Sequence, residues 1–525
     1  MTRQGENGRP RTGAAAKGRR SPDGNPADPA KRGAGGKPGG GRQQGAGSGR
    51  GTSGPAHAGG QRGVAAGGAD PVRRVACDVL RAVAERDAYA NLLLPSLLRS
   101  RGLTGRDAAL ATELTYGTLR GRGAYDAILA VCADRRIEDV DPPLRDVLRL
   151  GAHQLLATRV RSHAAVATSV DLAKDVAGQR TAGFVNAVLR RVATRDLDEW
   201  LRIVEPDGTA DPVGRLAIRY SHPPWIVAAF RDALGGEPAG ALAETEAALA
   251  AGNSRARVAL CAVPGLADPA ELVASGGEAM RWSPFGVYLE KGDPAAVPAV
   301  AEGRAAVQDE ASQLAALALA RAELTGPDHR WLDICAGPGG KTRLLAGLAR
   351  ERGARLLAAD VRPHRAGLVR AATRFLANTG VVVADGTAGA WRDGMFDRVL
   401  ADVPCSGLGS LRRRPEARWR KTPADVNGLA VLQRALLTAA LDSARPGGVV
   451  AYVTCSPHVA ETREAVAAVT ETRNDVTVLD AAAVLAEVPD VRCPDAGGGY
   501  AQFWPHRHGT DAIFLALLRR EAAVS

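Results

Sequence analysis

Two hydrophobic runs that each end in a cysteine are the parts of this chain whose residue types and spacing could do chemistry. The first run, Arg398–Ser406, contains Cys405, and the second, Val449–Ser456, contains Cys455. Each predicts a buried β-strand that delivers a thiol to its carboxyl end. Open α/β sheets bind their ligands at that edge. The sequence therefore predicts that the two cysteines converge on one site.

A glycine-rich turn after another predicted strand suggests a cofactor loop. Its candidate binding residues are Cys335, Ala336, Gly337, Pro338, Gly339, Gly340 and Lys341. A P-loop needs a glycine six residues before the lysine, where Cys335 stands, and Thr342 breaks a dinucleotide fingerprint at its last glycine. What remains is a tight turn and a helix N-terminus whose backbone can approach a ligand. Asp360 and Asp385 end the next two predicted strands, and the set fits an adenosine-containing cofactor without a long phosphate chain.

The positive charge of the chain is concentrated at its start. The 525 residues carry a net charge of +11, and residues 1–70 hold 12 Lys and Arg against 4 Asp and Glu. These residues include 21 glycines and no Leu, Ile or aromatic residue. They cannot bury enough apolar area to offset their ordering entropy, so we expect a disordered basic tail. Such a tail favours a nucleic acid partner, although a solvated tail without a partner stays open.

The cysteines and the apolar runs bound the cellular setting. The seven cysteines are scattered and form no C-x-x-C pair, which argues against a zinc cluster and fits a reduced cytosolic protein. No apolar signal core or membrane-length run is present in the sequence. We therefore expect a cytoplasmic protein without a metal or a membrane partner. The remaining cysteines are expected to be small core residues: Cys77, Cys132, Cys261 and Cys493.

Patterning divides the rest of the chain into three segments. Apolar residues at helical spacing over 71–215 predict an all-helical domain. Residues 216–300 predict an α+β connector, with a helix over 220–234, a strand over 255–263 and a role in RNA contact. Residues 301–525 alternate strands with helices, which predicts a parallel sheet covered on both faces. Its expected strands are 331–334, 355–360, 381–384, 398–401, 449–454 and 512–518.

Three motifs carry a family resemblance. DICAGPGGKT at 333–342, DVPCSG at 402–407 and YVTCS at 452–456 resemble the signatures of the S-adenosylmethionine-dependent RNA cytosine-C5 methyltransferases. GRAAVQDEASQL at 303–314 and LRRRPEARWRKT at 411–422 are similar to that family's flanking segments. Residues 71–215, with YANLLL at 89–94 and ELTYG at 113–117, resemble the NusB-like RNA-binding domain. This domain order resembles the RsmB (Sun/Fmu) branch, which methylates 16S ribosomal RNA.

The resemblance implies a fold, a cofactor and a mechanism. It implies an all-α NusB-like domain and a C-terminal α/β, Rossmann-like class I methyltransferase domain that binds S-adenosyl-L-methionine. It assigns the nucleophile that attacks cytosine C6 to Cys455 and assistance in product release to Cys405. Asp402 would bind the pyrimidine edge, stabilise developing charge and contact the cofactor. Lys341 would orient this cluster.

The target base must be unpaired or flipped, because a stacked base cannot present its faces. A basic run with an aromatic residue follows Cys405 and suits contact with an RNA backbone, the alternative being a solvated loop. The candidate RNA-binding residues are Arg412, Arg413, Arg414, Arg418, Trp419 and Arg420.

We expect a monomeric enzyme that methylates a cytosine of 16S rRNA, either free or in a small-subunit assembly intermediate. One alternative is a relative that acts on tRNA or 23S rRNA. Another is a non-catalytic RNA-binding assembly factor that kept the fold. The intact set of Cys405, Cys455, Asp402 and Gly337–Lys341 disfavours the second alternative.

Overall fold

The structure is a computed structural model that describes residues 70–290, 292–494 and 499–522. The predicted basic tail, residues 1–70, therefore lies outside the described residues except for its last member. Asp70 caps the first helix, because its side chain accepts a hydrogen bond from the backbone N–H of Arg73.

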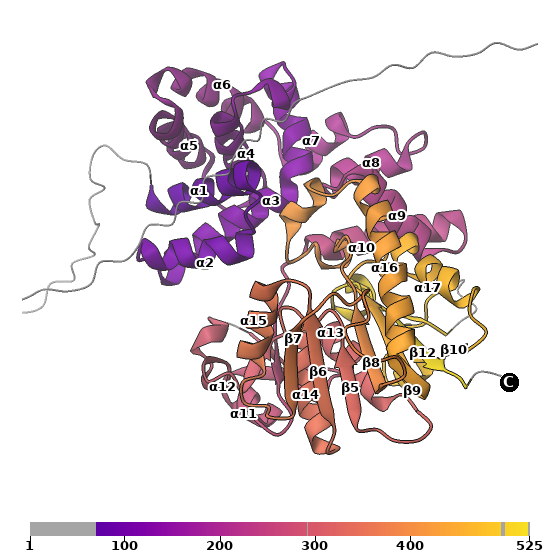
Figure 1. Cartoon of the computed structure of the whole chain (residues 1–525). Coiled ribbons are helices and arrows are strands. Elements are labelled where there is room, and N and C mark those ends of the chain that lie inside the picture. Colours follow the sequence, from indigo (N-terminus) through magenta and orange to yellow (C-terminus); the bar gives the residue numbers. More distant parts are fainter. Residues whose placement is uncertain (1–69, 291, 495–498, 523–525) are drawn as a thin grey trace, which may run out of the picture. The chain divides into compact units, whose positions relative to one another are not determined.

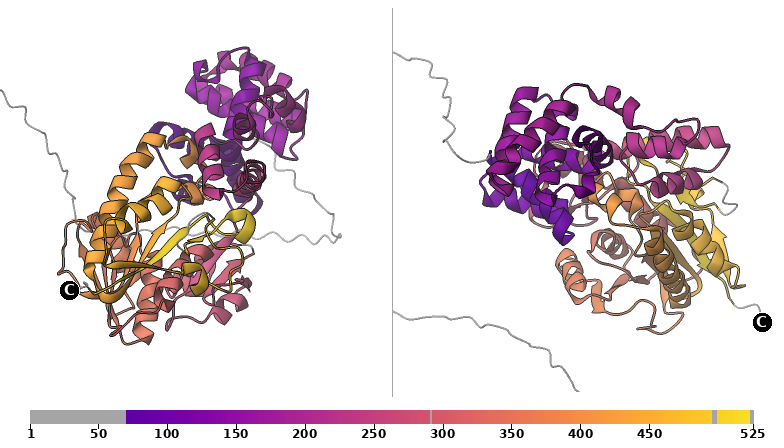
Figure 2. Two further views of the ribbon diagram at one scale, coloured as in Figure 1. Left: turned by 90° about the vertical axis from the view of Figure 1, so that its right-hand side faces the viewer. Right: turned by 90° about the horizontal axis from the view of Figure 1, so that it is seen from above.

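Residues 70–204 contain α-helices and no strand. The helices are α1 (Pro71–Arg86), α2 (Ala90–Ser100), α3 (Gly105–Ala133), α4 (Pro142–Ala157), α5 (Ser162–Ala177), α6 (Ala182–Val192) and α7 (Leu197–Val204). They enclose one apolar core, to which the long helix α3 contributes the fully buried Leu114, Ile128 and Leu129. Figure 2 shows the bundle of these indigo-to-purple helices from two further directions. The sequence-based expectation of a helical domain is confirmed.

Three more helices precede the first strand. They are α8 (Pro212–Arg219), α9 (Pro224–Leu234) and α10 (Pro238–Asn253). Helix α9 matches the expected helix, and α10 lies in the stretch that we expected to be α+β. Residues 241–251 are mostly alanine and leucine, which favour helix more strongly than the flanking glycines disfavour it. These helices pack against Leu408, Leu411 and Trp504 from much later in the chain.

A small antiparallel sheet and a helix then lead into the main sheet. Its strands β1 (Val258–Ala262), β2 (Gly277–Ala279), β3 (Gly286–Leu289) and β4 (Ala305–Val307) have the order β2-β3-β1-β4, and α11 (Pro269–Ala274) and α12 (Pro298–Ala301) connect them. Helix α13 (Glu310–Arg321) follows β4, and Asp309 caps it by accepting from the backbone N–H of Ala311.

The main sheet has the strand order β10-β12-β9-β8-β5-β6-β7 (Figure 1). Strand β11 pairs with β12. The strands are β5 (Arg330–Asp333), β6 (Arg355–Asp360), β7 (Thr379–Val383), β8 (Phe396–Asp402), β9 (Ala444–Thr454), β10 (Val476–Leu479), β11 (Ala501–Gln502) and β12 (Phe514–Arg520). Strands β5 to β9 pair in parallel, whereas β12 is antiparallel to both β9 and β10. The expected all-parallel sheet is therefore wrong at this end, because apolar patterning does not encode strand direction. Antiparallel edge strands are common on such sheets.

Helices cover both faces of the main sheet, as expected. They are α14 (Gly340–Glu351), α15 (Pro363–Ala372), α16 (Pro423–Ser443), α17 (Arg463–Thr470), α18 (Ala481–Val484) and α19 (Pro505–His508), together with α13. Alternate residues of β9 enter two cores: Val449, Ala451 and Val453 pack with α13 and α14. Val450 and Tyr452 pack with α16 and α17. This two-sided burial explains why β8 and β9 read as unbroken apolar runs.

Candidate active site

Two thiols meet at the carboxyl edge of the sheet. Cys405 follows β8 and Cys455 follows β9, and their Sγ atoms lie 3.2 Å apart, with both residues partly buried. The parallel pairing of Asp402 with Val453 sets this register. The turn that carries Cys405 is also tied to the other strand, because the backbone N–H of Gly409 donates to the carbonyl of Cys455 at 2.9 Å.

The two thiols have opposite acidities. The pKa of Cys455 is lowered chiefly by its hydrogen bond with Cys405, which outweighs the opposing effects of burial and of Asp402. Lys341 and Arg414 also favour the thiolate. The same hydrogen bond, with burial and the neighbouring charge, raises the pKa of Cys405 well above its ordinary value. Of the two thiols, Cys455 therefore forms the thiolate more readily. A thiolate rather than a thiol is the reactive nucleophile.

A lysine and an aspartate form an ion pair beside the thiols. Lys341, in the first turn of α14, donates from Nζ to Oδ2 of Asp402 at 2.9 Å. Burial alone would lower the pKa of Lys341, but the carboxylate of Asp402 raises it overall. The lysine is thus a fixed positive charge that orients Asp402 and also acts on Cys455.

Asp333, which ends β5, is a buried carboxyl group of this cluster. Burial raises its pKa to about 7, although Thr342 Oγ1 donates to its Oδ2 at 2.7 Å. It was not among the predicted site residues. Its place at the end of a strand, directly before the glycine-rich turn, is the signal that could have identified it.

A buried glutamate joins the two cysteine loops. Glu461 accepts hydrogen bonds from the backbone N–H of Ser406 at 2.7 Å and from Nε2 of Gln433 at 3.0 Å. The hydroxyl of Ser406 also donates to Glu461 and contacts that of Ser456 at 3.1 Å. Glu461 is fully buried. Sequence reasoning did not single it out, because its main partner lies 55 positions earlier.

The glycine-rich loop is held by the end of the next strand. The backbone N–H of Gly337 donates to Oδ2 of Asp360 at 3.1 Å, and Arg362 N–H donates to the other oxygen at 2.9 Å. A Cβ on Gly337 would lie 2.4 Å from the Asp360 carboxylate, so this position requires glycine. Gly339 adopts φ +106° and its Cβ would lie 2.7 Å from that of Ala372.

The other predicted cofactor residues vary in position. Within the loop, Ala336 is buried, Pro338 is exposed, and Gly340 begins α14. Cys335 is partly buried, and burial raises the pKa of its thiol, which fits a packing role. Asp385 follows β7 but is exposed, and it accepts hydrogen bonds only from Thr387, which lower its pKa. The backbone cradle and the buried Asp360 fit a ligand with ribose hydroxyls better than Asp385 does.

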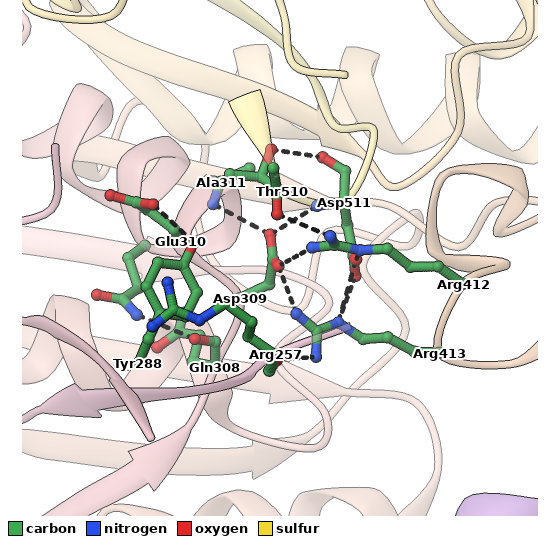
Figure 3. Close-up of polar contacts among 12 residues, drawn as sticks. Arg257, Tyr288, Gln308, Asp309, Glu310, Ala311, Arg412, Arg413, Thr510 and Asp511 are labelled. Carbon is green, nitrogen blue, oxygen red and sulfur yellow. Dashed lines mark hydrogen bonds and ion pairs between the residues drawn. The ribbon is translucent and has the colours of Figure 1, made fainter. Parts of the chain in front are cut away.

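The first two predicted RNA-binding arginines are engaged within the protein. Arg412 contacts Asp511 at 2.7 Å and Asp309 at 3.0 Å, and Arg413 contacts Asp309 at 2.6 Å (Figure 3). Asp309 precedes α13 and Asp511 precedes β12, so this ionic cluster of Asp309, Arg412, Arg413 and Asp511 fixes the Cys405 loop against two other segments. These two arginines therefore have a structural role as ion-pair partners.

The next predicted residues are also used internally. Arg418 has no exposed surface and donates to the carbonyls of Arg120, Ser221 and Gly252. Burial lowers its pKa to about 9, with a further contribution from Arg120.

Trp419 and Arg420 complete this junction. The Trp419 ring packs on Gly123 and under the guanidinium of Arg122. Arg420 donates to the carbonyl of Ala88 at 2.6 Å. Residues 418–420 are thus held against helices of residues 71–253, and RNA contact by this run stays a prediction. Arg414 alone among the six is exposed and without an ion pair in the described chain.

No group of three or more His, Cys, Asp or Glu among the described residues could hold a metal ion. No helix within the described ranges is long and apolar enough to cross a membrane.

Comparison with known proteins places this geometry among RNA methyltransferases. Residues 322–519 match the family model described as 16S rRNA methyltransferase RsmB/F, and residues 70–194 match that of the NusB family. A Mycobacterium tuberculosis protein with a provisional methyltransferase name is 52% identical over 455 residues, which cover 86% of this chain and 97% of that protein. Ribosomal RNA small subunit methyltransferase B of Pseudomonas putida is 33% identical over 471 residues, covering 86% of this chain and 99% of that enzyme. The crystal structure of PH0851 shares the fold, with a TM-score of 0.69 at 22% identity over 86% of this chain and 98% of that one.

Proposed function

The chain belongs to the 16S rRNA methyltransferase RsmB/F family, and from this we propose that it methylates C5 of one cytosine in 16S rRNA with S-adenosyl-L-methionine as donor. The observation that carries the proposal is the thiol pair at the ends of β8 and β9, in which Cys455 has a lowered pKa. Two cysteines of unequal acidity suit a reaction that needs a nucleophile first and an acid or base later.

Cys455 acts first in the proposed reaction. Its thiolate adds to C6 of the cytosine, and the new S–C6 bond places electron density on C5. S-adenosyl-L-methionine, when bound, supplies an electrophilic methyl group that C5 accepts. Asp402 and Lys341 hold the pyrimidine edge and balance the charge that develops there. The ion pair between them keeps both side chains oriented.

Cys405 acts second. In the free enzyme, its proton is retained chiefly because of the hydrogen bond to Cys455 and burial. Once Cys455 is bonded to C6, it is no longer a thiolate, so the main cause that raises the pKa of Cys405 is lost. Cys405 can then lose its proton to solvent, and the resulting thiolate takes the C5 proton. The electron pair of the C5–H bond re-forms the C5–C6 double bond, so the S–C6 bond breaks and Cys455 leaves as a thiolate. The same pair thus changes roles between the two steps.

The remaining residues bind the donor and the substrate. Residues 335–341 and Asp360 would hold the donor, with the carboxylate toward the ribose hydroxyls. Two backbone amides orient that carboxylate. We assign RNA binding to the NusB-like helices of residues 71–215 and to the segment over 216–300, which lead into a methyltransferase domain over 301–525.

Bisulfite sequencing of total RNA from a strain that lacks this chain tests the proposal. We expect one cytosine of 16S rRNA to lose its protection and to regain it with the wild-type chain but not with Cys455→Ala. Loss of protection only in tRNA or 23S rRNA would move the enzyme to another substrate. Unchanged protection at every cytosine of these RNAs would leave a non-catalytic RNA-binding factor and overturn the proposal.

A further inference from the structure

A cavity beside the Cys405 loop is rich in arginine. Its volume is 490 Å³, within the range of pockets that enclose a small ligand (roughly 300–1,000 Å³). It lies between helices α2 and α3, the segment that leads into β1, and the end of the Cys405 loop. Six arginines and one carboxylate, Glu113, line it. The arginines are Arg120, Arg255, Arg257, Arg412, Arg413 and Arg414.

Half of these arginines are already neutralised by carboxylates. Arg412 and Arg413 share Asp309 and Asp511, as Figure 3 shows, and Arg257 pairs with Glu278. Their positive charge is therefore largely balanced within the protein, and they form a fixed wall of the cavity. They cannot be the main source of attraction for an anion.

The other three arginines have no ion pair in the described chain. Arg255 and Arg414 are exposed, and Arg120 is partly buried with its guanidinium 5.8 Å from the centre of the Tyr116 ring. The Nε of Arg120 is buried and makes no hydrogen bond. An unpaired guanidinium donor away from water is costly, because arginine stays charged and its donors want acceptors. Glu113 lies nearby but makes no hydrogen bond to Arg120.

The position of the cavity connects it to the thiols. Arg414 lies nine residues after Cys405 and is close enough for its charge to favour the Cys455 thiolate. Arg414 thus belongs both to the cavity lining and to the surroundings of the Cys455 sulfur. Guanidinium groups recognise phosphate oxygens through paired donors, which makes a phosphodiester the matching chemistry.

We propose that this cavity binds phosphodiester groups of the single-stranded RNA next to the target cytosine, through Arg120, Arg255 and Arg414. The inference rests on the proposed function for the identity of the RNA and goes beyond it by naming a binding site. It places the RNA strand across α3 of the helical segment on its way to Cys455.

The test is the salt dependence of RNA binding by an Arg120→Ala/Arg255→Ala variant. Both proteins also carry Cys455→Ala and are measured without methyl donor on a single-stranded RNA fragment, so that binding is separated from catalysis. Each lost phosphate contact should lower the slope of log affinity against log salt by about 0.7, so the double variant should lose about 1.4. A matched control, Arg330→Ala/Arg355→Ala, removes two exposed arginines at the starts of β5 and β6, which lie outside the cavity and have no ion pair in the described chain.

Each outcome decides the matter. A larger loss of slope in the cavity variant than in the control supports the site, and equal slopes overturn it. Arg255 is exposed and has no ion pair in the described chain, so Arg255→Ala alone should fold normally. This single variant should lower the salt slope by about 0.7 even if the double variant folds poorly. Calorimetry with inorganic phosphate forms the last arm: binding lost in the variant while the RNA slope is unchanged would indicate a small-anion site and overturn the RNA assignment. If the cavity variant loses salt slope as expected but the wild-type chain methylates no RNA, the proposed function is refuted and the RNA-binding role of the cavity still stands.

Discussion

The sulfur atoms of Cys405 and Cys455 lie 3.2 Å apart although 50 positions separate the residues. The hydrogen bond between them makes the two thiols unequal in acidity: the pKa of Cys455 is lowered and that of Cys405 is raised. This one hydrogen bond is the main cause of both pKa shifts, so neither cysteine alone has the chemistry of the pair.

The first prediction concerns the nucleophile. Cys455→Ala should abolish methyl transfer, because the variant lacks the sulfur that adds to C6 of the cytosine. Binding of S-adenosyl-L-methionine should stay near the wild-type value. Filter assays with labelled donor and calorimetry measure the two quantities. Substantial turnover by the purified variant would sink the assignment.

The second prediction separates the two thiols by their products. Cys405→Ala can still form the S–C6 bond but lacks the group that removes the C5 proton, so a covalent protein–RNA adduct should accumulate. A denaturing gel shows the adduct as a slowly migrating band. Appearance of that band with Cys455→Ala instead would reverse the two roles.

The third prediction uses the acidity of Cys455. In Cys405→Ala, the donor that lowers the pKa of Cys455 is gone, so the pKa rises and a smaller thiolate fraction is present at neutral pH. Alkylation of Cys455 by iodoacetamide, followed by mass spectrometry, should therefore shift to higher pH. Cys405→Ser is the matched control, because a hydroxyl can still donate. Identical pH profiles for both variants and the wild type would show that the hydrogen bond with Cys405 does not lower the pKa of Cys455.

The fourth prediction compares two aspartates at strand ends. Asp360→Ala should weaken S-adenosyl-L-methionine by about 1.5–3 kcal/mol, the range for charge-assisted hydrogen bonds. Asp385→Ala serves as comparison and should have a smaller effect, since that side chain is exposed and bonds only to Thr387. Calorimetry measures both affinities. A larger loss for Asp385 would show that the cofactor lies against the other strand.

The fifth prediction concerns the ionic cluster. Burial opposes ionisation of Asp309, but Arg413 and Arg412 hold its pKa below the ordinary value. Asp309→Ala leaves both arginines short of a partner and should lower the free energy of unfolding by roughly 3–5 kcal/mol. Because the folded-state pKa is depressed, this contribution is complete above the unfolded-state pKa and is lost as pH falls through the folded-state value.

Urea denaturation at several pH values measures the fifth effect. Glu278→Ala, which removes one partner of an exposed ion pair, should cost under about 1 kcal/mol and serves as the control. Equal costs for the two variants would show that the buried cluster has no special weight.

The sequence predicted what short-range patterns determine. Apolar runs located β8 and β9 to within a few residues and indicated that Cys405 and Cys455 would meet, because the carboxyl ends of parallel strands share one edge. The glycine-rich turn is also a short-range signal: Gly339 has a positive φ that favours glycine, and a Cβ on Gly337 would collide with the Asp360 side chain.

Long-range partners were beyond reach of the same patterns. Arg412 and Arg418 read as basic loop residues because their neighbours in sequence are basic, whereas their partners, such as Asp309 and the carbonyl of Gly252, lie more than a hundred positions away. The composition of a segment gives the number of its charged side chains, but it does not show whether carboxylates from distant segments form ion pairs with them. The direction of β12 was missed in the same way, since alternation is identical in either orientation.

The complete burial of Arg418 bears on how this protein can be divided. Its guanidinium binds carbonyls from α3, from the turn before α9 and from the end of α10, and Glu416 beside it accepts from the backbone N–H of Ala90. The catalytic half and the helical half thus share one interior at residues 416–420. A clone that begins after α7 would expose that interior to solvent, so the methyltransferase half is not a module that can be excised, swapped or expressed alone without redesign of this seam.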